Sequence, residues 1–350
     1  MTGHHRRALL RHLALLLTPA LAHRAYAAGP AAGTAAEARA PWPSRPVRLL
    51  VGFPGGSSPD MAARGLADTL ARALGQPVVV ENRPGASGNI AADAVAKATD
   101  DHTLGVLING NLTSARLLNP RLPFDPARDF TAVSLLATAP LVLVGAVSEP
   151  AGADFLRAAQ RAGAAWNYGS VGVGSVGHLG MELLKSRVGF AATHVPYNGN
   201  PAVMTALIAG QIQAALVPPG VALPQVRAGK VRAIGLTGGR STLAPEVAPL
   251  RSLETAASAP GRSGSTALNL NLDELEVWVA LVGPAALSAA AQARLSALVP
   301  TLLREPEARQ RLFNAGWQVQ ASSPQALRLR VQEETRVLGQ IIRQRGITLE

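Results

Sequence analysis

The sequence predicts an α/β protein of two domains, each with a mostly parallel sheet flanked by helices. Strand and helix patterns alternate from residue 47 to residue 108, and a second alternation runs from residue 154 to residue 237. The apolar runs of strand length end in Gly- or Pro-rich turns that lead into amphipathic helices. The 350-residue chain is also long enough for two domains of roughly 150 residues each.

The first 27 residues are expected to be a secretory signal peptide. A basic start precedes an apolar run over residues 8–17, and cleavage is expected near Ala27 or Ala22. The run is too short for a membrane anchor, and two arginines in the basic start leave general and twin-arginine export both open. We therefore expect a periplasmic protein whose mature N-terminus, residues 28–41, is disordered.

Composition excludes several classes of protein. The sequence has no cysteine, so disulfides and a lipid-anchored N-terminus are ruled out. The net charge is +11, and the four arginines of the signal peptide leave about +7 on the mature chain. Because the arginines are spread along helices and are not interleaved with aromatic residues, we expect no nucleic-acid partner.

The first alternation gives the first half of one domain. In its first helix, Met61, Leu66, Leu70 and Leu74 form an apolar stripe. A strand that follows the Pro-rich loop at 119–126 is expected to cross into the second domain. We expect strands at 47–53, 77–81, 103–108, 131–136 and 141–147, and helices at 60–74 and 89–98.

The second alternation forms the other domain, and the chain then returns to the first. We expect helices at 154–162, 178–188, 201–209 and 221–228, and strands at 166–171, 192–195, 212–217 and 231–237. A Gly- and Ser-rich surface loop at 255–272 precedes a strand at 276–282, a turn at Gly283–Pro284, and helices from Ser288, Pro306 and Pro324. The last helix is expected to pack on the first domain. Domain I is thus 42–145 plus 274–350, and domain II is 146–273, with at least two strands crossing between them.

Three glycine-rich turns between a strand and a helix are candidate anion sites. They are Phe53–Arg64, where Ser58 is expected to cap a helix, Arg83–Asn89, and Tyr168–His178. Helix N-termini leave backbone N–H groups unpaired and carry the positive end of the helix dipole. In open α/β sheets, ligands bind at the carboxyl ends of the strands, which is where these turns lie.

One of these turns also fits a dinucleotide site. Gly172, Gly174 and Gly177 spell G-x-G-x-x-G between a strand and a helix. However, no acidic residue stands about twenty positions later, where a ribose would need one. No nucleophile elbow, phosphate loop or metal-ligand spacing occurs. We therefore expect no catalytic residue, no metal and no cofactor, with a dinucleotide-dependent enzyme as the alternative.

Two further residues allow two interpretations each. His178 either caps its own helix start or faces a ligand. Tyr197 either extends its hydroxyl into a cleft or packs at a strand end. The sequence does not distinguish these cases.

Several motifs in the expected order together resemble one family. Trp42–Pro46, Phe53–Arg64, Val80–Gly85, Pro123–Pro126, Tyr168–Leu179 and His194–Gly199 resemble the substrate-binding proteins of tripartite tricarboxylate transporters, the Bug family. The resemblance runs from about residue 42 to the end. It implies the two-domain periplasmic binding protein fold of type II, which closes about hinge crossover strands and has no catalytic activity.

The resemblance also implies the function. Such a protein captures a small organic carboxylate in the inter-domain cleft and delivers it to the integral-membrane subunits of a transporter. We expect a monomer. A sensor that reports ligand occupancy to a membrane receptor would share every one of these sequence features.

In that family, backbone and hydroxyl groups of three turns hold the carboxylate, partly through ordered water. The expected ligand-binding residues are Phe53, Gly55, Gly56, Ser57, Ser58, Asp60, Arg83, Gly85, Ala86, Ser87, Asn109, Asn111, Ser170, Gly172, Gly174, Ser175, His178 and Tyr197. The chain departs from the family where Val217–Pro219 replace an acidic residue, which favours a ligand without an amino group.

Overall fold

The computed structural model describes residues 42–254, 270, 272–273 and 275–348. The expected signal peptide, the expected disordered segment at 28–41 and most of the expected loop at 255–272 lie outside the described residues. Among the described residues, no helix is both long and apolar enough to cross a membrane.

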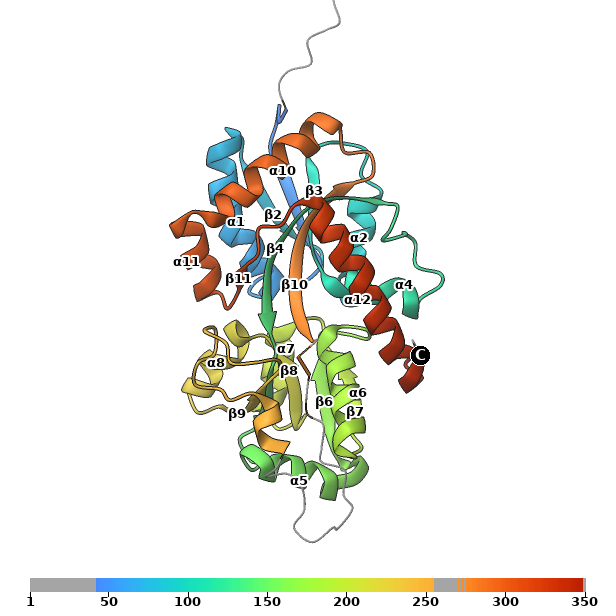
Figure 1. The fold of residues 1–350 in the computed structure, drawn as a ribbon, viewed down its shortest axis with the longest axis vertical. Coiled ribbons are helices and arrows are strands. Elements are labelled where there is room, and N and C mark those ends of the chain that lie inside the picture. The colour runs from blue at the N-terminus through green and yellow to red at the C-terminus, as the bar shows by residue number, and fades with distance from the viewer. Residues whose placement is uncertain (1–41, 255–269, 271, 274, 349–350) are drawn as a thin grey trace, which may run out of the picture. The chain divides into compact units, whose positions relative to one another are not determined.

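The first sheet, sheet A, has six strands in the order β11-β4-β10-β3-β1-β2 (Figure 1). Strand β1 pairs in parallel with β2 and β3, whereas β10 pairs antiparallel with β3 and β4, and β11 pairs antiparallel with β4. The strands are β1 (Val47–Val51), β2 (Val78–Asn82), β3 (Thr103–Ile108), β4 (Phe130–Pro140), β10 (Glu276–Pro284) and β11 (Gln318–Val319).

The second sheet, sheet B, has five strands in the order β7-β6-β8-β5-β9. Strand β6 pairs in parallel with β7 and β8, and β5 pairs antiparallel with β8 and β9. The strands are β5 (Val142–Ala146), β6 (Asn167–Ser170), β7 (Thr193–Pro196), β8 (Ala214–Val217) and β9 (Val231–Leu236). Both sheets are therefore mixed. The expected parallel pairing holds for β1–β3 and for β6–β8. The crossing strands β4, β5 and β10 pair antiparallel, and so does β9 with β5, contrary to expectation.

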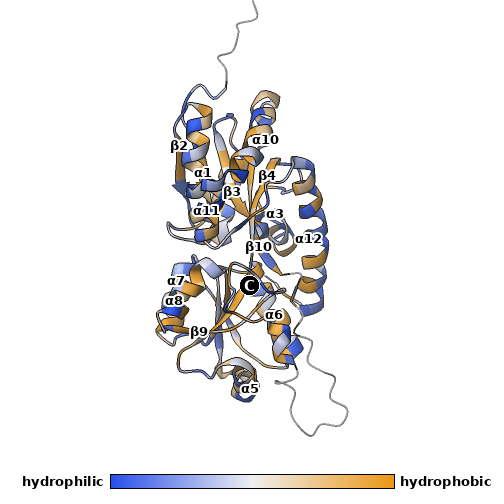
Figure 2. Ribbon diagram, turned by 60° about the vertical axis from the view of Figure 1, so that its left-hand side comes forward, coloured by the Kyte–Doolittle hydropathy of each residue, from blue (hydrophilic) through white to orange (hydrophobic). Residues whose placement is uncertain are grey.

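Helices cover both faces of each sheet. Sheet A carries α1 (Ser58–Leu74), α2 (Asn89–Ala96), α3 (Asn109–Leu112), α4 (Ser114–Leu118), α10 (Ala289–Arg304) and α11 (Pro306–Asn314). Sheet B carries α5 (Gly152–Ala162), α6 (Val176–Val188), α7 (Asn200–Ile208) and α8 (Pro219–Arg227). Figure 2 shows mostly hydrophobic strands and helices that carry both hydrophobic and hydrophilic residues.

The alternation of side chains along each strand builds a core on each face of sheet A. In β1, Leu49 and Val51 pack with α1, α10 and α11, whereas Leu50 packs with α2 on the opposite face. In β10, Val279 lies on the face covered by α1, and Trp278 lies on the face covered by α2. All five of these side chains in β1 and β10 are buried. The expected turn at Gly283–Pro284 instead forms the end of β10, because these residues pair with Thr131 and Phe130.

Two segments join the sheets. Strand β4 leads into β5 through Leu141 alone, and the chain returns from β9 to β10. Thr237 ties the two segments together: its hydroxyl accepts from the Leu141 N–H at 2.8 Å and donates to the Leu275 carbonyl at 2.9 Å. Because β5 pairs with β8 and β9 of sheet B, the chain crosses at Leu141, the first residue of the strand expected at 141–147.

The last helix, α12 (Pro324–Arg345), packs on elements of both sheets. Leu327 belongs to a core of sheet A, whereas Leu338, Ile341 and Ile342 belong to a core with α6 of sheet B. The expected packing on the first domain holds for the N-terminal part of this helix, and its 22 residues extend past sheet A, so that its C-terminal part also packs on α6.

Candidate functional site

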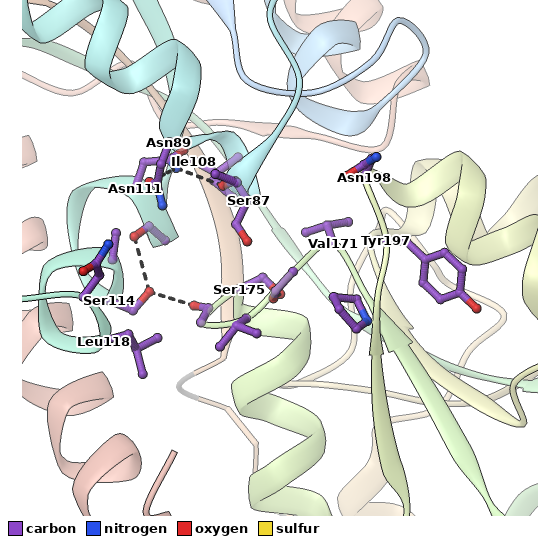
Figure 3. Close-up of a pocket in the computed structure, with 18 residues that line it drawn as sticks. Ser87, Asn89, Ile108, Asn111, Ser114, Leu118, Val171, Ser175, Tyr197 and Asn198 are labelled. Carbon is purple, nitrogen blue, oxygen red and sulfur yellow. Dashed lines mark hydrogen bonds between the residues drawn. The ribbon is translucent and has the colours of Figure 1, made fainter. Parts of the chain in front are cut away.

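A cavity of about 330 Å³, here called the main cavity, lies between elements of the two sheets (Figure 3). Sheet A contributes the turn after β2 and the helices α3 and α4, and sheet B contributes the turns after β6 and β7. Its lining residues are Ala86, Ser87, Asn89, Ile108, Gly110, Asn111, Ser114, Ala115, Leu118, Asn119, Val171, Gly172, Val173, Gly174, Ser175, Pro196, Tyr197 and Asn198.

A second cavity of about 40 Å³, here called the inner cavity, adjoins the main one and shares Ile108, Val171 and Ser175 with it. This volume holds a group no larger than a few atoms. Its other lining residues are Phe53, Ser57, Ser58, Pro59, Asn109, Leu141, Val176, Gly177, Asn200, Leu216, Pro218 and Val277.

Four helix N-termini border the inner cavity. The starts of α1, α6, α7 and α8 contribute Ser57, Ser175, Asn200 and Pro218 to its lining. Each N-terminus carries the positive end of a helix dipole. Pro59, Pro201 and Pro219 have no N–H in the first turns of α1, α7 and α8, and Ser175 takes one N–H of α6, so the remaining first-turn N–H groups are the backbone donors here. None of the described lining residues of either cavity is Asp, Glu, Lys or Arg. The inner cavity therefore favours an anion through backbone and hydroxyl donors.

Three polar atoms at these cavities have no hydrogen-bond partner within the described chain. They are Ser57 Oγ and Asn109 Oδ1 at the inner cavity and Asn111 Oδ1 at the main cavity. Each side chain is at most 1% exposed. Buried polar groups without a partner are rare in folded proteins, so these atoms are candidates for ligand contacts.

A buried carboxylate holds the turn before α1. Asp60 accepts from the Gly56 N–H at 2.9 Å, the Asn82 side chain at 2.8 Å and the Arg64 guanidinium at 3.0 Å. Burial acts to raise the pKa of Asp60, but these donors outweigh it and lower the pKa below its ordinary value. Asp60 thus shapes the turn from behind and lines neither cavity.

The start of α1 also differs from expectation. Ser57, not Ser58, is the N-cap residue, and its side chain makes no capping bond. Gly55 and Gly56 are exposed and line neither cavity. Ser57 lines the inner cavity, and its hydroxyl has no hydrogen-bond partner among the described residues.

The turn after β2 reaches the main cavity through two strained residues. Ala86 and Ser87 have φ values of 48° and 57°, a region that L-residues avoid at a cost of about 1–2 kcal/mol each. Arg83, expected at the site, instead donates to Glu81 at 2.8 Å, and Gly85 packs against Ile90. Neither lines a cavity.

Close packing and backbone conformation explain why glycine occupies the positions of the G-x-G-x-x-G sequence. A Cβ on Gly172 would lie 2.9 Å from Ser87 Cβ, and one on Gly177 would lie 2.8 Å from the Leu216 carbonyl oxygen. Gly174 has a φ of 79°. The Ser175 side chain caps α6 by accepting the His178 N–H and donates to the Gly172 carbonyl at 2.8 Å. Close packing therefore accounts for the fingerprint without a nucleotide.

His178 supports this loop from inside the domain. Its Nδ1 accepts the Gly174 N–H at 3.1 Å, and its ring stacks on His194 with centroids 4.0 Å apart. Ser170 is part of the same support, with its hydroxyl 2.7 Å from His194 Nε2. Neither His178 nor Ser170 lines a cavity, so the interpretation of His178 as a residue that faces a ligand is wrong.

Burial keeps both histidines neutral. It lowers the pKa of His178 to about 4 and that of His194 to about 3, where the neighbouring His178 and Lys185 lower the pKa further. A neutral His178 is required for Nδ1 to accept the Gly174 N–H. Among the described residues, no three His, Asp or Glu side chains group together to hold a metal ion.

These pKa values predict acid sensitivity. Above pH 6.5 both histidines are neutral in the folded and the unfolded chain, so their contribution to stability is complete. As the pH falls from 6.5 toward 4, only the unfolded chain takes up these protons, and the free energy of unfolding falls by at most about 1.4 kcal/mol per pH unit for each histidine. Urea unfolding at pH 7, 6 and 5 measures this slope. The double variant His178→Asn/His194→Gln should flatten it, and an unchanged slope would contradict the assignment.

Tyr197 lines the main cavity without directing its hydroxyl into it. Its ring packs over Gly169, where a Cβ would lie 3.2 Å from Tyr197 Cε2, and it joins a core of sheet B. Figure 3 shows the ring pointing away from the other labelled side chains. Of the two interpretations, the structure supports a tyrosine packed at a strand end, because the apolar core beside β6 holds the ring.

Three polar residues near the cavities lie outside the expected set, and two of them, Ser114 and Asn200, connect the two sides. Ser114 donates its hydroxyl to the Gly174 carbonyl at 2.7 Å, and the Asn200 side chain donates to Ser58 Oγ at 3.1 Å. Asn89 accepts from Asn111 at 2.9 Å. Asn200 follows a glycine and precedes a proline at a helix start, a signal that marks a turn, whereas Ser114 has no local signal.

Comparison with known proteins identifies similar chains. A family model described as the tripartite tricarboxylate transporter family receptor matches residues 62–347. The protein BugT of Bordetella pertussis is 36% identical over 218 residues, which are 61% of this chain and 67% of BugT.

Two solved structures are similar in both sequence and fold. An R. palustris protein with adipate aligns with a TM-score of 0.78 and 28% identity, covering 88% of this chain and 99% of that one. MatC from Rhodopseudomonas palustris with bound malate aligns with a TM-score of 0.76 and 29% identity, covering 86% of this chain and all of MatC.

Proposed function

The chain belongs to the tripartite tricarboxylate transporter receptor family, the Bug family, and from this premise we propose its ligand, its site and its partner. Membership makes it a solute-binding receptor and not an enzyme. We propose that it captures a small organic carboxylate in the two adjoining cavities. It then delivers this ligand to the membrane subunits of a tripartite tricarboxylate-type transporter.

The observation that carries this proposal is the inner cavity with its four helix N-termini and no charged lining residue. A carboxylate placed there receives backbone N–H groups and the Ser57 hydroxyl, which has no other partner. The rest of the ligand then occupies the main cavity. The relatives solved with adipate and malate support a carboxylate as the ligand class.

Binding would proceed by closure of two lobes, one built on each sheet, about the crossings at Leu141 and Leu275. The bonds from Ser114 to Gly174 and from Asn200 to Ser58 join the lobes in the arrangement described here. A ligand that contacts both lobes binds the closed arrangement more tightly than the open one, and this difference in affinity favours closure.

We also propose that the chain is exported and that it does not form oligomers. The N-terminal 27 residues act as a signal peptide, and the mature chain works in the periplasm as a monomer. These features agree with the family's place in transport across the inner membrane.

A thermal-shift screen of the mature chain against carboxylates and dinucleotides tests the function. A ligand at a hundred times its dissociation constant adds about 2.7 kcal/mol to the free energy of unfolding. We expect one or more carboxylates to raise the melting temperature, and NAD and NADP to leave it unchanged. A shift with a dinucleotide and with no carboxylate would favour the enzyme alternative.

Ser57→Ala tests the inner cavity itself. Because Ser57 Oγ has no partner among the described residues, its removal should cost about 1 kcal/mol of binding, or roughly fivefold in affinity, with little change in stability. Calorimetric titration with the carboxylate from the screen measures this change. Tyr197→Phe serves as the control and should bind as the wild type does. Equal affinities for all three proteins would remove Ser57 from the site.

A further inference from the structure

An open groove of about 660 Å³, here called the outer groove, lies at the edge of sheet A. It is formed by the end of α10, by α11 and by β11, and Figure 1 shows α11 and β11 on the same side of the sheet. The groove shares no lining residue with the main cavity or the inner cavity. The proposed function therefore leaves the outer groove without a role.

Strand β11 is the outer strand of sheet A, and it lines this groove. The Gln320 N–H donates to the Leu136 carbonyl at 3.0 Å, so the backbone of Gln320 faces β4. Backbone groups alternate sides along an antiparallel strand, so the N–H and carbonyl of Val319 point away from β4. The edge of β11 thus offers a donor and an acceptor to an extended chain that lies beside it.

The side chains of the outer groove are basic and aromatic. Arg304 and Arg309 line it and are exposed, and none of its described lining residues is Asp or Glu. Among the residues that the structure describes, neither arginine takes part in an ion pair, whereas Arg311 in α11 pairs with two carboxylates. Phe313, which is 42% exposed, lines the groove as well. Exposed arginine and aromatic side chains are typical of protein interfaces, and guanidinium groups without a partner favour carboxylates.

The outer groove continues toward the lobe built on sheet B. A neighbouring cavity of about 400 Å³ shares Thr242 and Phe313 with it, and residues of α8, including Gly220, line the other side of that cavity. Trp317 lines the outer groove and donates its Nε1–H to the Ser58 carbonyl at 3.0 Å, and Ser58 lines the inner cavity. The groove therefore has its full extent only where the two lobes are in contact.

We propose that the outer groove docks an extended, acidic segment of the transporter's membrane subunits. The segment lies beside β11 as an added strand, and its alternate side chains place carboxylates on Arg304 and Arg309. This inference rests on the proposed function, because that function supplies the partner. Since the neighbouring cavity needs both lobes, the segment binds the carboxylate-loaded chain more tightly than the empty chain.

Two fluorescein-labelled pentapeptides test the chemistry of the groove on the mature chain. One alternates glutamate with valine, and the other alternates lysine with valine. By fluorescence anisotropy, the glutamate peptide should bind at least about tenfold more tightly than the lysine peptide, and Arg304→Gln/Arg309→Gln should weaken it about tenfold. Arg328→Gln/Arg345→Gln is the matched control, because it removes the same charge from exposed positions of α12 outside the groove. This control should keep the affinity.

Val319→Pro tests the pairing with β11. It removes the N–H that points away from β4, and proline is tolerated at such positions of an edge strand. The glutamate peptide should bind about fivefold more weakly, with an unchanged affinity for the carboxylate from the thermal-shift screen. If this variant does not fold, the arginine variant still decides the outcome.

Uptake of the same carboxylate, carrying a radioactive label, tests the source of the segment. In cells of the organism that encodes this chain, Arg304→Gln/Arg309→Gln should lower uptake at least about tenfold, whereas the purified variant binds the carboxylate as the wild type does. The α12 control should keep full uptake.

Three results would overturn the docking inference and leave carboxylate binding intact. They are full uptake by the Arg304→Gln/Arg309→Gln variant, no preference for the glutamate peptide, and a dimer in sedimentation experiments that this variant abolishes. If no carboxylate binds and deletion of the chain changes the uptake of none, the proposed function itself fails.

Discussion

Gly220→Ala is expected to weaken carboxylate binding by about 10- to 100-fold without unfolding the protein. Gly220 begins α8 on sheet B, and a Cβ there would lie 2.1 Å from the backbone oxygen of Ala315, which precedes β11 on sheet A. Backbone atoms cannot rotate away, so the lobes must separate. Overpacking of this kind costs about 1–3 kcal/mol, and that cost falls on the closed arrangement.

The affinity is measured by calorimetry and the stability by thermal unfolding of the unliganded chain. Gly220 lies in a helix where Ala is the better residue, so the isolated lobe should lose no stability. Gly239→Ala, in the segment after β9, meets only ordinary contact at 3.5 Å and should bind as the wild type does. Wild-type affinity in Gly220→Ala would show that the close contact of the lobes is not needed for binding.

Glu334→Ala is expected to lower the free energy of unfolding by about 2–4 kcal/mol. Glu334 is 8% exposed and accepts hydrogen bonds from Trp278, Asn109 and Arg330. Burial raises the pKa of Glu334, although these three donors oppose the rise. Its removal leaves the Trp278 N–H without its acceptor and leaves the Asn109 amide with the Glu276 carbonyl alone.

Urea unfolding measures this loss, and Glu333→Ala is the control from the same helix. Glu333 is exposed and pairs with Arg336, so its removal should change the free energy of unfolding by less than about 0.5 kcal/mol. Because Glu334 also holds the Asn109 amide, Glu334→Ala should weaken ligand binding as well. Equal stability of the two variants would contradict the role assigned to the buried carboxylate.

Features with local causes were predictable from the sequence. The strand expected at 103–108 forms Thr103–Ile108, because its apolar run ends where polar residues begin. Helices start beside Ser288, Pro306 and Pro324 as expected, since capping serines and N-terminal prolines act within one turn. The turns that line the cavities were found for the same reason.

The orientation of side chains was not predictable, because partners distant in the sequence decide it. Asp60 and His178 lie in the expected turns, yet Asn82 and Gly174 engage their side chains away from the cavities. The Tyr197 ring packs into the apolar core beside Gly169, which is 28 positions earlier in the sequence. Ser114 was missed because its partner, the Gly174 carbonyl, is 60 residues away. The antiparallel pairing of the strands at the crossings was not predictable either, because it also depends on partners that are distant in the sequence.

For Asn109 and Asn111, the position in the fold was predictable from the sequence, but the orientation of the side chains was not. Asn109 and Asn111 were expected as ligand-binding residues, and they lie in the short helix α3. Their place was predictable from the end of β3, but the orientation of their amides depends on Ser87, Glu276 and Glu334.

The most direct measurement compares a carboxylic acid with its own primary amide. Calorimetric titration of the mature chain uses the carboxylate that gives the largest thermal shift, together with the amide of the same acid. The four helix N-termini at the inner cavity predict that the acid binds at least about 100-fold more tightly, because only the acid carries the negative charge that they favour. Equal affinity for the acid and its amide would contradict a carboxylate receptor. Binding heat with a dinucleotide and none with any carboxylate would contradict it as well.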